Sequence, residues 1–200
     1  MTLIQKEVKN MYIGEYVAPS IYSYDFRNKT QAQVETDWWT IFTPYNSDAD
    51  GYYTNPWGAL RRTIVDLASA KKVTINAEMK VASGSSIWSI GCAITDWSTA
   101  VYGFVSWNTS SNKWTQIYNN WARTTRSNQY AVSWDASYTL EIDLVTGAIT
   151  STVVNNWNTQ SITATATAST IAAIVAGHKF ETYPDSSSHR LKTIQITVEY

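Results

Sequence analysis

Two carboxylates, Glu141 and Asp143, are the residues of this sequence whose spacing best suits acid–base chemistry. They lie two positions apart in YTLEIDLVT, where alternating polarity predicts a strand, so both project from one face of it. Hydrolysis of a glycosidic bond needs two carboxyl groups that flank the bond, one of them a proton donor. The pair therefore raises the question of whether this strand belongs to a sugar-cleaving site.

The stretch EIDLVT resembles the E-I-D-x-x-E strand of the laminarinase-type glycoside hydrolases, which share the concanavalin A-like sandwich. In that family the first glutamate acts as nucleophile and the last as acid/base. Glu141 and Asp143 match the pattern, but Val145 or Thr146 takes the last position, and neither side chain can protonate a leaving group. The resemblance therefore implies that the protein is not an enzyme, with a remnant or altered site as the alternative.

A second candidate lies in YNSDADGYYTNPW, residues 45–57, which matches the first half of an EF-hand calcium loop. Asn46, Asp48 and Asp50 place oxygen ligands at alternate positions, and a glycine follows where the loop must turn. Trp57 stands where that pattern requires a bidentate glutamate. Because asparagine, aspartate and glycine are also typical of tight turns, the stretch is either an ordinary turn or a calcium site. We expect no cofactor, with calcium as the alternative.

Histidine and cysteine chemistry find little support in the sequence. His178 and His189 are not at metal-binding spacing, and no G-x-S-x-G nucleophile elbow is present. Cys92 is the single cysteine and lies in the apolar stretch IWSIGCAIT, so we expect a buried thiol.

Aromatic residues give the strongest binding signal, because the chain has 10 Trp and 13 Tyr but only 4 Phe. Tyrosine and tryptophan are favoured where an apolar ring must also meet water or a ligand. Several lie beside polar residues in turn-like stretches such as YNNWARTTR, where rings can stack on a sugar and amides or guanidinium groups can bond its hydroxyls. The predicted ligand-binding residues are Tyr52, Tyr53, Trp57, Trp97, Trp114, Asn119, Asn120, Trp121, Arg123 and Trp157.

The elements that position these residues are predominantly strands. In VTINAEMKV, YTLEIDL and IQITVEY alternate residues form one apolar face, and Gly147 in LVTGAI predicts a hairpin turn. The best helix candidate is WGALRRTIVDLASA, residues 57–70, in which three apolar residues recur at helical spacing. We expect SITATATAST to be an edge strand or an exposed loop.

The regular succession of short strands and polar turns predicts an all-β fold, a two-sheet antiparallel β-sandwich of the jelly-roll type. A chain of 200 residues suits a single domain over residues 21–200, preceded by an N-terminal strand or attachment segment over residues 1–20. YDFRNKTQAQVETDWWTIF and YTLEIDLVTGAI resemble strands of concanavalin A-like or jelly-roll carbohydrate-binding domains. That resemblance implies a sugar-binding sandwich.

The segment EVKNMYIGEYVAPS, residues 7–20, is similar to N-terminal segments of bacteriophage and prophage tail or surface-appendage proteins. The similarity implies a virion structural protein whose partners are bacterial surface polysaccharides or other glycans, and other virion proteins. A homo-oligomer fits such an appendage. No signal-peptide pattern is visible, so we expect the protein on the virion, or extracellular after lysis, with the cytoplasm as the alternative.

Charge and hydropathy exclude other partners. A formal net charge of -1 leaves no basic excess for nucleic acid, and no stretch is long and apolar enough for membrane insertion. The sequence therefore predicts a non-catalytic phage-like virion or tail protein with a glycan-binding adhesin or receptor-binding sandwich. Two alternatives stay open: a purely structural or decoration protein without a ligand, and a polysaccharide hydrolase or lyase of sandwich fold.

Overall fold

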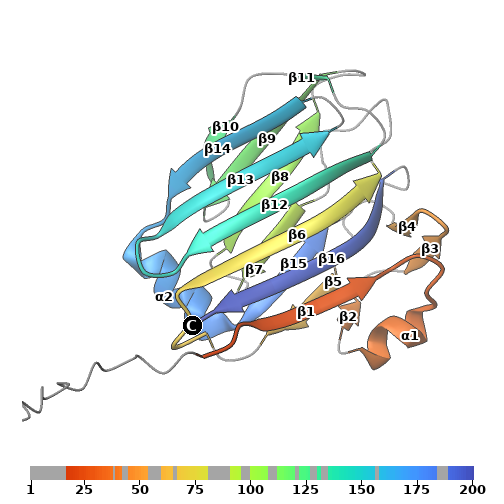
Figure 1. Cartoon of the computed structure of the whole chain (residues 1–200), viewed down its shortest axis with the longest axis horizontal. Helices are drawn as coiled ribbons and strands as arrows, with labels where there is room; N and C mark the ends of the chain where they lie inside the picture. Colours follow the sequence, from red (N-terminus) through yellow and green to blue (C-terminus); the bar gives the residue numbers. More distant parts are fainter. Residues whose placement is uncertain are drawn as a thin grey trace, which may run out of the picture.

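Two antiparallel sheets of eight strands each lie face to face and enclose the apolar core (Figure 1). The computed structural model describes residues 17–37, 39–41, 45–53, 60–64, 67–80, 91–95, 100–107, 112–119, 122–126, 130–131, 135–155, 158–183 and 189–200. The predicted two-sheet antiparallel β-sandwich is confirmed. Across these residues, no helix has the length and apolar character needed to cross a membrane.

Sheet A, the nearer layer in Figure 1, has the strand order β14-β13-β12-β6-β16-β4-β3, and β1 also pairs with β16. Its strands are β1 (Ser20–Asp25), β3 (Asn46–Asp48), β4 (Gly51–Tyr53), β6 (Lys72–Lys80), β12 (Asp135–Asp143), β13 (Ala148–Asn155), β14 (Asn158–Thr165) and β16 (Arg190–Glu199).

Sheet B lies behind it with the order β10-β9-β8-β7-β15-β5-β2, and β11 also pairs with β9. Its strands are β2 (Trp39–Ile41), β5 (Leu60–Thr63), β7 (Gly91–Thr95), β8 (Ala100–Trp107), β9 (Asn112–Asn119), β10 (Ala122–Arg126), β11 (Tyr130–Ala131) and β15 (Lys179–Tyr183).

Burial along the strands of sheet A follows the predicted alternation. Ten inward residues of the three predicted strands are at most 3% exposed: Val73, Ile75, Ala77, Met79, Tyr138, Leu140, Ile142, Ile194, Ile196 and Val198. At the strand ends Leu144 is 8% exposed and Tyr200 is partly buried, and Val81 lies outside the described residues. A slip of one residue would turn each apolar set to the solvent, so burial of one face fixes the pairing register. The outward residues of the same strands are polar, and they form the free face of sheet A.

The hairpin between β12 and β13 turns at Gly147, as predicted. Its φ is 76°, in the left-handed region that glycine adopts without steric cost. β13 pairs with β14, which is the edge strand of sheet A. The edge-strand prediction for this segment is therefore confirmed as far as Thr165.

A short helix, α1 (Gln31–Thr36), separates β1 from β2. A capping box starts it: the backbone N–H of Gln33 donates to Thr30 Oγ1 and the backbone N–H of Thr30 donates to Gln33 Oε1 at 2.8 Å. These bonds satisfy two N–H groups that a helix start otherwise leaves unpaired.

The longer helix, α2 (Ala168–Gly177), connects β14 of sheet A to β15 of sheet B at one end of the sandwich (Figure 1). Thr167 caps its N-terminus, and Ile171 and Ile174 are buried on its inner side. The helix ends at His178, whose backbone adopts the left-handed conformation with φ 50°.

The helix predicted over residues 57–70 is wrong. Residues 60–63 form β5, which pairs with β2 and β15. Leu60, Ile64 and Leu67 are buried, so the apolar pattern identifies core residues correctly. The apolar residues of this segment recur at helical spacing, but the segment pairs with a strand on each side. These tertiary contacts outweigh the local helix propensity.

Aromatic rings fill the core near β1 and β2. The ring centroids of Phe26 and Trp39 are 5.3 Å apart, and those of Trp39 and Phe180 are 5.7 Å apart, both in edge-to-face geometry. Such pairs add about 0.5–1.5 kcal/mol each beyond the burial of their area. Phe26 directly follows β1 of sheet A, so these contacts join the end of β1 to β2 and β15 of sheet B across the core.

Candidate functional site

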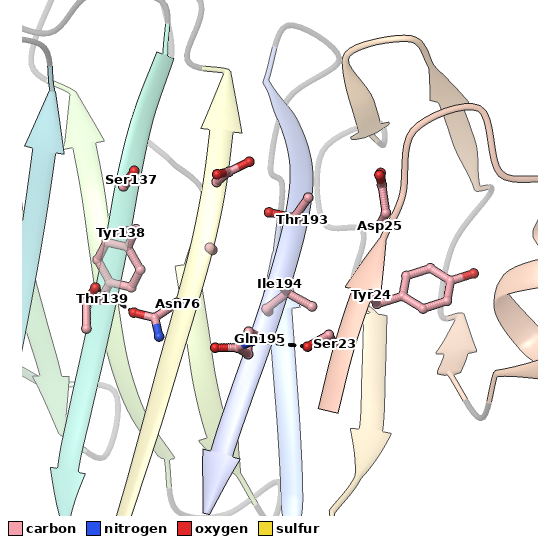
Figure 2. Close-up of a pocket in the computed structure, with 12 residues that line it drawn as sticks. Ser23, Tyr24, Asp25, Asn76, Ser137, Tyr138, Thr139, Thr193, Ile194 and Gln195 are labelled. Atoms are coloured by element: carbon pink, nitrogen blue, oxygen red, sulfur yellow. Dashed lines mark hydrogen bonds between the residues drawn. The ribbon is translucent and has the colours of Figure 1, made fainter. Parts of the chain in front are cut away.

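A groove of about 550 Å³ crosses the outer face of sheet A (Figure 2). It spans four neighbouring strands, β1, β16, β6 and β12, so it brings together residues that are far apart in the chain. Small-molecule sites typically measure about 300–1,000 Å³. The described residues that line the groove are Ser23, Tyr24, Asp25, Asn76, Ala77, Glu78, Ser137, Tyr138, Thr139, Thr193, Ile194 and Gln195.

Strand register arranges the outward residues of this groove in two rows across the strands. The first row is Ser23, Gln195, Asn76 and Thr139, and the second is Asp25, Thr193, Glu78 and Ser137. Because neighbouring strands are about 4.8 Å apart, each row extends for roughly 14 Å. The groove is therefore long enough for a chain of several sugars.

Hydrogen bonds between neighbouring strands hold the first row in place (Figure 2). Thr139 Oγ1 donates to Asn76 Oδ1 at 2.8 Å, and Gln195 Nε2 donates to Ser23 Oγ at 3.2 Å. An amide side chain has a donor and an acceptor end, and a hydroxyl is both at once. The row therefore presents both kinds of group, as recognition of sugar hydroxyls requires.

Two acidic residues lie in the second row, and their surroundings differ. Asp25 is bound by Arg27, with 2.9 Å from Nε to Oδ1 and 2.6 Å from Nη2 to Oδ2. The side-chain hydrogen bonds from Arg27 lower the pKa of the Asp25 carboxyl group below its usual value. Glu78 is exposed, and within the described residues it forms no ion pair.

Glu78 also lines a second hollow of about 340 Å³ on the same face, together with Ser137, Asp135 and Lys192. In this hollow Lys192 Nζ lies 2.5 Å from Asp135 Oδ1, so the two charges balance. Glu78 thus lines both hollows, and among their described carboxylates it is the one that forms no ion pair. Arg27, which is paired with Asp25, also acts on it electrostatically.

The calcium candidates lie in the hairpin of β3 and β4, where each carboxylate has a partner. Asp48 Oδ1 accepts a hydrogen bond from the backbone N–H of Asp50 at 2.8 Å, and Asp48 Oδ2 accepts one from Arg190 Nε at 2.8 Å. Asp50 forms an ion pair with Lys80, and Asn46 pairs in register with Tyr53. This is the arrangement of a turn.

No group of three or more His, Cys, Asp or Glu within the described residues could hold a metal ion. The pKa of Asp48 also reflects its partners in the turn. Partial burial alone would raise it, but the hydrogen bonds from Arg190 and from the Asp50 backbone prevail and lower it. A charged carboxylate at this position therefore stabilises the hairpin.

The two tyrosines of β4 have different surroundings. Tyr52 is fully buried and its ring stacks on Tyr45 with 4.9 Å between centroids. The prediction that Tyr52 contacts a ligand is therefore wrong, because the alternation of β4 turns this ring into the core. Tyr53 is half-buried, and the guanidinium carbon of Arg190 lies 3.7 Å from its ring centroid. One face of the Tyr53 ring is thus already covered by a cation.

Three predicted ligand residues lie on strands of sheet B. Trp114 and Asn119 belong to β9, and Arg123 belongs to β10. Asn119 pairs in register with Ala122, which places Asn119 and Arg123 close together along the β9–β10 ladder. The remaining candidates lie outside the described residues, and for them ligand binding stays a prediction: Trp57, Trp97, Asn120, Trp121 and Trp157.

Glu141 and Asp143 have structural partners. Glu141 forms an ion pair with Lys72 on the neighbouring strand β6. Asp143 Oδ1 accepts hydrogen bonds from the backbone N–H groups of Thr146 at 2.7 Å and Val145 at 2.9 Å. These two bonds lower the pKa of Asp143, so its charged form stabilises the turn. Neither residue lines the groove of Figure 2.

The two histidines serve the fold. His178 Nδ1 accepts a hydrogen bond from the backbone N–H of Leu67 at 3.2 Å, and His189 is only 3% exposed. Cys92 lies on β7 of sheet B.

The groove residues were missed by sequence reasoning, which concentrated on aromatic loops. Asn76, Glu78, Thr139 and Gln195 occupy the polar positions of correctly predicted strands, and Ser137 and Thr193 directly precede two of these strands. Alternation identifies them as outward-facing. The sequence has no signal for which strands are neighbours, and that neighbourhood creates the groove.

Comparison with solved structures places this architecture among known folds. Peanut lectin superposes with a TM-score of 0.61 at 10% sequence identity, covering 91% of this chain and 98% of the lectin. The acidic lectin of winged bean, solved with methyl-alpha-D-galactose, gives a TM-score of 0.59 at 7% identity, covering 91% of this chain and 99% of the lectin. The chain has the concanavalin A-like fold.

A carbohydrate esterase of the Shiga toxin-encoding bacteriophage phi24B shares this concanavalin A-like fold with a TM-score of 0.56 at 10% identity. The superposition covers 90% of this chain and all of the esterase structure. No family profile matches the chain, and no curated protein matches it. The predicted jelly-roll, concanavalin A-like fold is thus confirmed by structure comparison.

Proposed function

We propose that the protein is a non-catalytic glycan-binding module, an adhesin or receptor-binding sandwich of a phage-like virion or tail. The observation that carries the proposal is the groove on sheet A, in which hydroxyl and amide groups from four strands line one cavity. Its outward residues hold no large apolar side chain, so the groove suits a polar ligand with many hydroxyl groups. Sugars are that class of ligand.

The comparisons support a sugar as the ligand class. Two of the proteins that share the fold are lectins, and a third is a phage-encoded carbohydrate esterase. The esterase also supports the phage setting, together with the N-terminal segment of residues 7–20. We expect bacterial surface polysaccharides as ligands, other virion proteins as partners, and a location on the virion.

The non-catalytic part of the proposal is supported by the candidate carboxylates. Glu141 is paired with Lys72, and Asp143 holds the β12–β13 turn. Asp25, the second carboxylate of the groove, forms an ion pair with Arg27. Incubation with polysaccharides should therefore release neither reducing ends nor unsaturated products, and either product would overturn this part.

The proposal is tested on an array of bacterial polysaccharides, followed by titration of the purified protein with the best ligand. Thr139→Val removes the hydroxyl that bonds Asn76 while keeping the shape of the side chain, so it should weaken binding severalfold. Thr163→Val on β14 is the matched control, because Thr163 is an exposed threonine on the same sheet outside the groove. It should leave the affinity unchanged.

Titration in the presence of a chelator tests the cofactor expectation. Asp48 and Asp50 already pair with Arg190 and Lys80, so binding should persist without calcium. If no bacterial glycan binds, the glycan-binding proposal fails. If Thr139→Val and Thr163→Val act alike, the groove is not the binding surface.

A further inference from the structure

The charge distribution of the sheet A groove suggests which glycans it selects. The described residues that line it include two carboxylates and no lysine, arginine or histidine. Asp25 is balanced by Arg27, and Asp135 in the adjoining hollow is balanced by Lys192. Glu78 is the carboxylate of the two hollows that forms no ion pair among the described residues, so its charge is the one most open to a ligand.

We propose that Glu78 is the specificity-determining residue of the groove, which selects neutral or amino-sugar polysaccharides and rejects acidic ones. This inference rests on the proposed glycan-binding function. Glu78 stands in the second row between Thr193 on β16 and Ser137 on β12, both neutral hydroxyl residues. A ligand that follows this row has to pass over its carboxylate.

A carboxylate at this place has two effects on a sugar chain. Its two oxygens can accept hydrogen bonds from adjacent sugar hydroxyls, and hydrogen bonds to a charged acceptor are roughly twice as strong as neutral ones. It also attracts the ammonium group of an amino sugar and repels the carboxylate of a uronic acid. Both ionic effects act at short range on a partly open surface, so salt weakens them.

The second hollow extends the preference for neutral or amino-sugar chains along the outer face of sheet A. Glu78 and Ser137 line both cavities, so a chain bound across the first continues over the second without leaving the influence of Glu78. Lys192 lies in that second hollow but is engaged by Asp135. An acidic polysaccharide would therefore meet one repelling group and a cation that is already paired.

The inference is tested with Glu78→Gln on the same polysaccharide array, sorted into neutral, amino-sugar and acidic chains. Wild-type protein should bind neutral or amino-sugar chains. Glu78→Gln should weaken that binding about threefold to tenfold, because a neutral amide replaces a charged acceptor. The ratio of neutral to acidic binding should fall by a similar factor, and this change should shrink in high salt.

Glu141→Gln is the matched control, since Glu141 lies on the same face but outside the groove and is paired with Lys72. It should leave the ratio unchanged. A wild-type preference for acidic chains would overturn the inference and leave the proposed function standing, as would a ratio that Glu78→Gln does not alter. Absence of binding to every polysaccharide would contradict the proposed function and this inference together.

Discussion

Arg61 and Glu181 lie directly opposite each other on β5 and β15 and form an ion pair, with 2.8 Å between Nη2 and Oε2. Their neighbours Leu60 and Phe180 belong to the core, so alternation turns the ion pair to the other face of sheet B. The two side chains are nevertheless only 7% and 3% exposed. Sheet B thus holds a buried pair of opposite charges outside the apolar core.

Breaking this pair from one side should destabilise the protein strongly. Arg61→Met leaves the Glu181 carboxylate buried without the guanidinium group, which typically costs about 3–5 kcal/mol. Adding Glu181→Leu should recover most of the loss, because two apolar side chains replace two charges. Denaturation in urea, followed by tryptophan fluorescence, measures both free energies of unfolding.

The control for the buried pair is Lys72→Met, which breaks the ion pair with Glu141 on sheet A. Both of those side chains are 36% exposed, and surface pairs contribute only about 0–1 kcal/mol. Equal losses for Arg61→Met and Lys72→Met would contradict the view that burial sets the strength of the first pair.

The glycine of the β3–β4 hairpin gives a second prediction. Gly51 has φ 120°, and a Cβ atom there would lie 2.2 Å from the carbonyl oxygen of Leu191. Gly51→Ala should therefore cost more than about 1 kcal/mol, since alanine meets both a disfavoured backbone conformation and a clash with β16. Thermal unfolding measures the loss.

Ala49→Gly provides the comparison in the same turn, because Ala49 is exposed. It should change the free energy of unfolding by less than about 0.5 kcal/mol, as is usual for surface substitutions. A wild-type unfolding curve for Gly51→Ala would show that the hairpin can move away from β16.

Alternation along single strands made the sandwich predictable from sequence. In β6 the residues from Val73 to Met79 alternate without exception between buried and outward positions, and the fold class follows from several such strands. The same rule could not detect α1, although the capping-box pair Thr30 and Gln33 is a helix signal in the sequence. The spacing of these two residues by itself predicts that a helix starts after Thr30.

The groove depended on information that a single sequence lacks. Gln195 and Asn76 are neighbours in space, yet more than a hundred positions separate them, and Arg61 and Glu181 are 120 residues apart. The aromatic composition indicated a ligand site on the surface. For Tyr52 this interpretation was wrong, because β4 pairs with β16 and the Tyr52 ring points into the core. Pairing between strands that are distant in the sequence determines both the position of the groove and the burial of Tyr52.

Acid should weaken the β3–β4 hairpin through Asp48. The pKa of this carboxyl group is 3.8 in an unfolded chain and lower in the folded protein, so its contribution to stability is present above about pH 4. The contribution is lost as the pH falls through the folded value. Asp48→Asn should therefore flatten the decline of the melting temperature between about pH 5 and pH 3.

Arg190→Gln tests the cause of this shift, because Arg190 donates a hydrogen bond to Asp48 and covers Tyr53. Without this hydrogen bond the folded-state pKa of Asp48 rises toward its unfolded value, so Arg190→Gln should flatten the acid decline as Asp48→Asn does. An acid decline in Asp48→Asn as steep as that of wild-type protein would assign the effect to other carboxyl groups.

The tryptophans predicted from sequence to bind sugars lead to a prediction about the number of sites. The chain on both sides of Trp121 belongs to β9 and β10 of sheet B, whereas the groove with Thr139 lies on sheet A. The described lining of the groove contains no tryptophan, so we expect a second glycan site for each chain at the predicted tryptophans. Two weak sites on one module bind a long polysaccharide more tightly than either does alone, through the raised effective concentration of the second contact.

Titration calorimetry with a short oligosaccharide should then show two equivalents bound to wild-type protein. Trp121→Ala should weaken one equivalent severalfold and Thr139→Val the other, and the double variant should lose both independently, because distant substitutions act additively. Trp39→Phe, in the core, should leave both unchanged. One equivalent that responds only to Thr139→Val would show that Trp121 does not contact the ligand. One equivalent that responds only to Trp121→Ala would show that the groove is not the binding site.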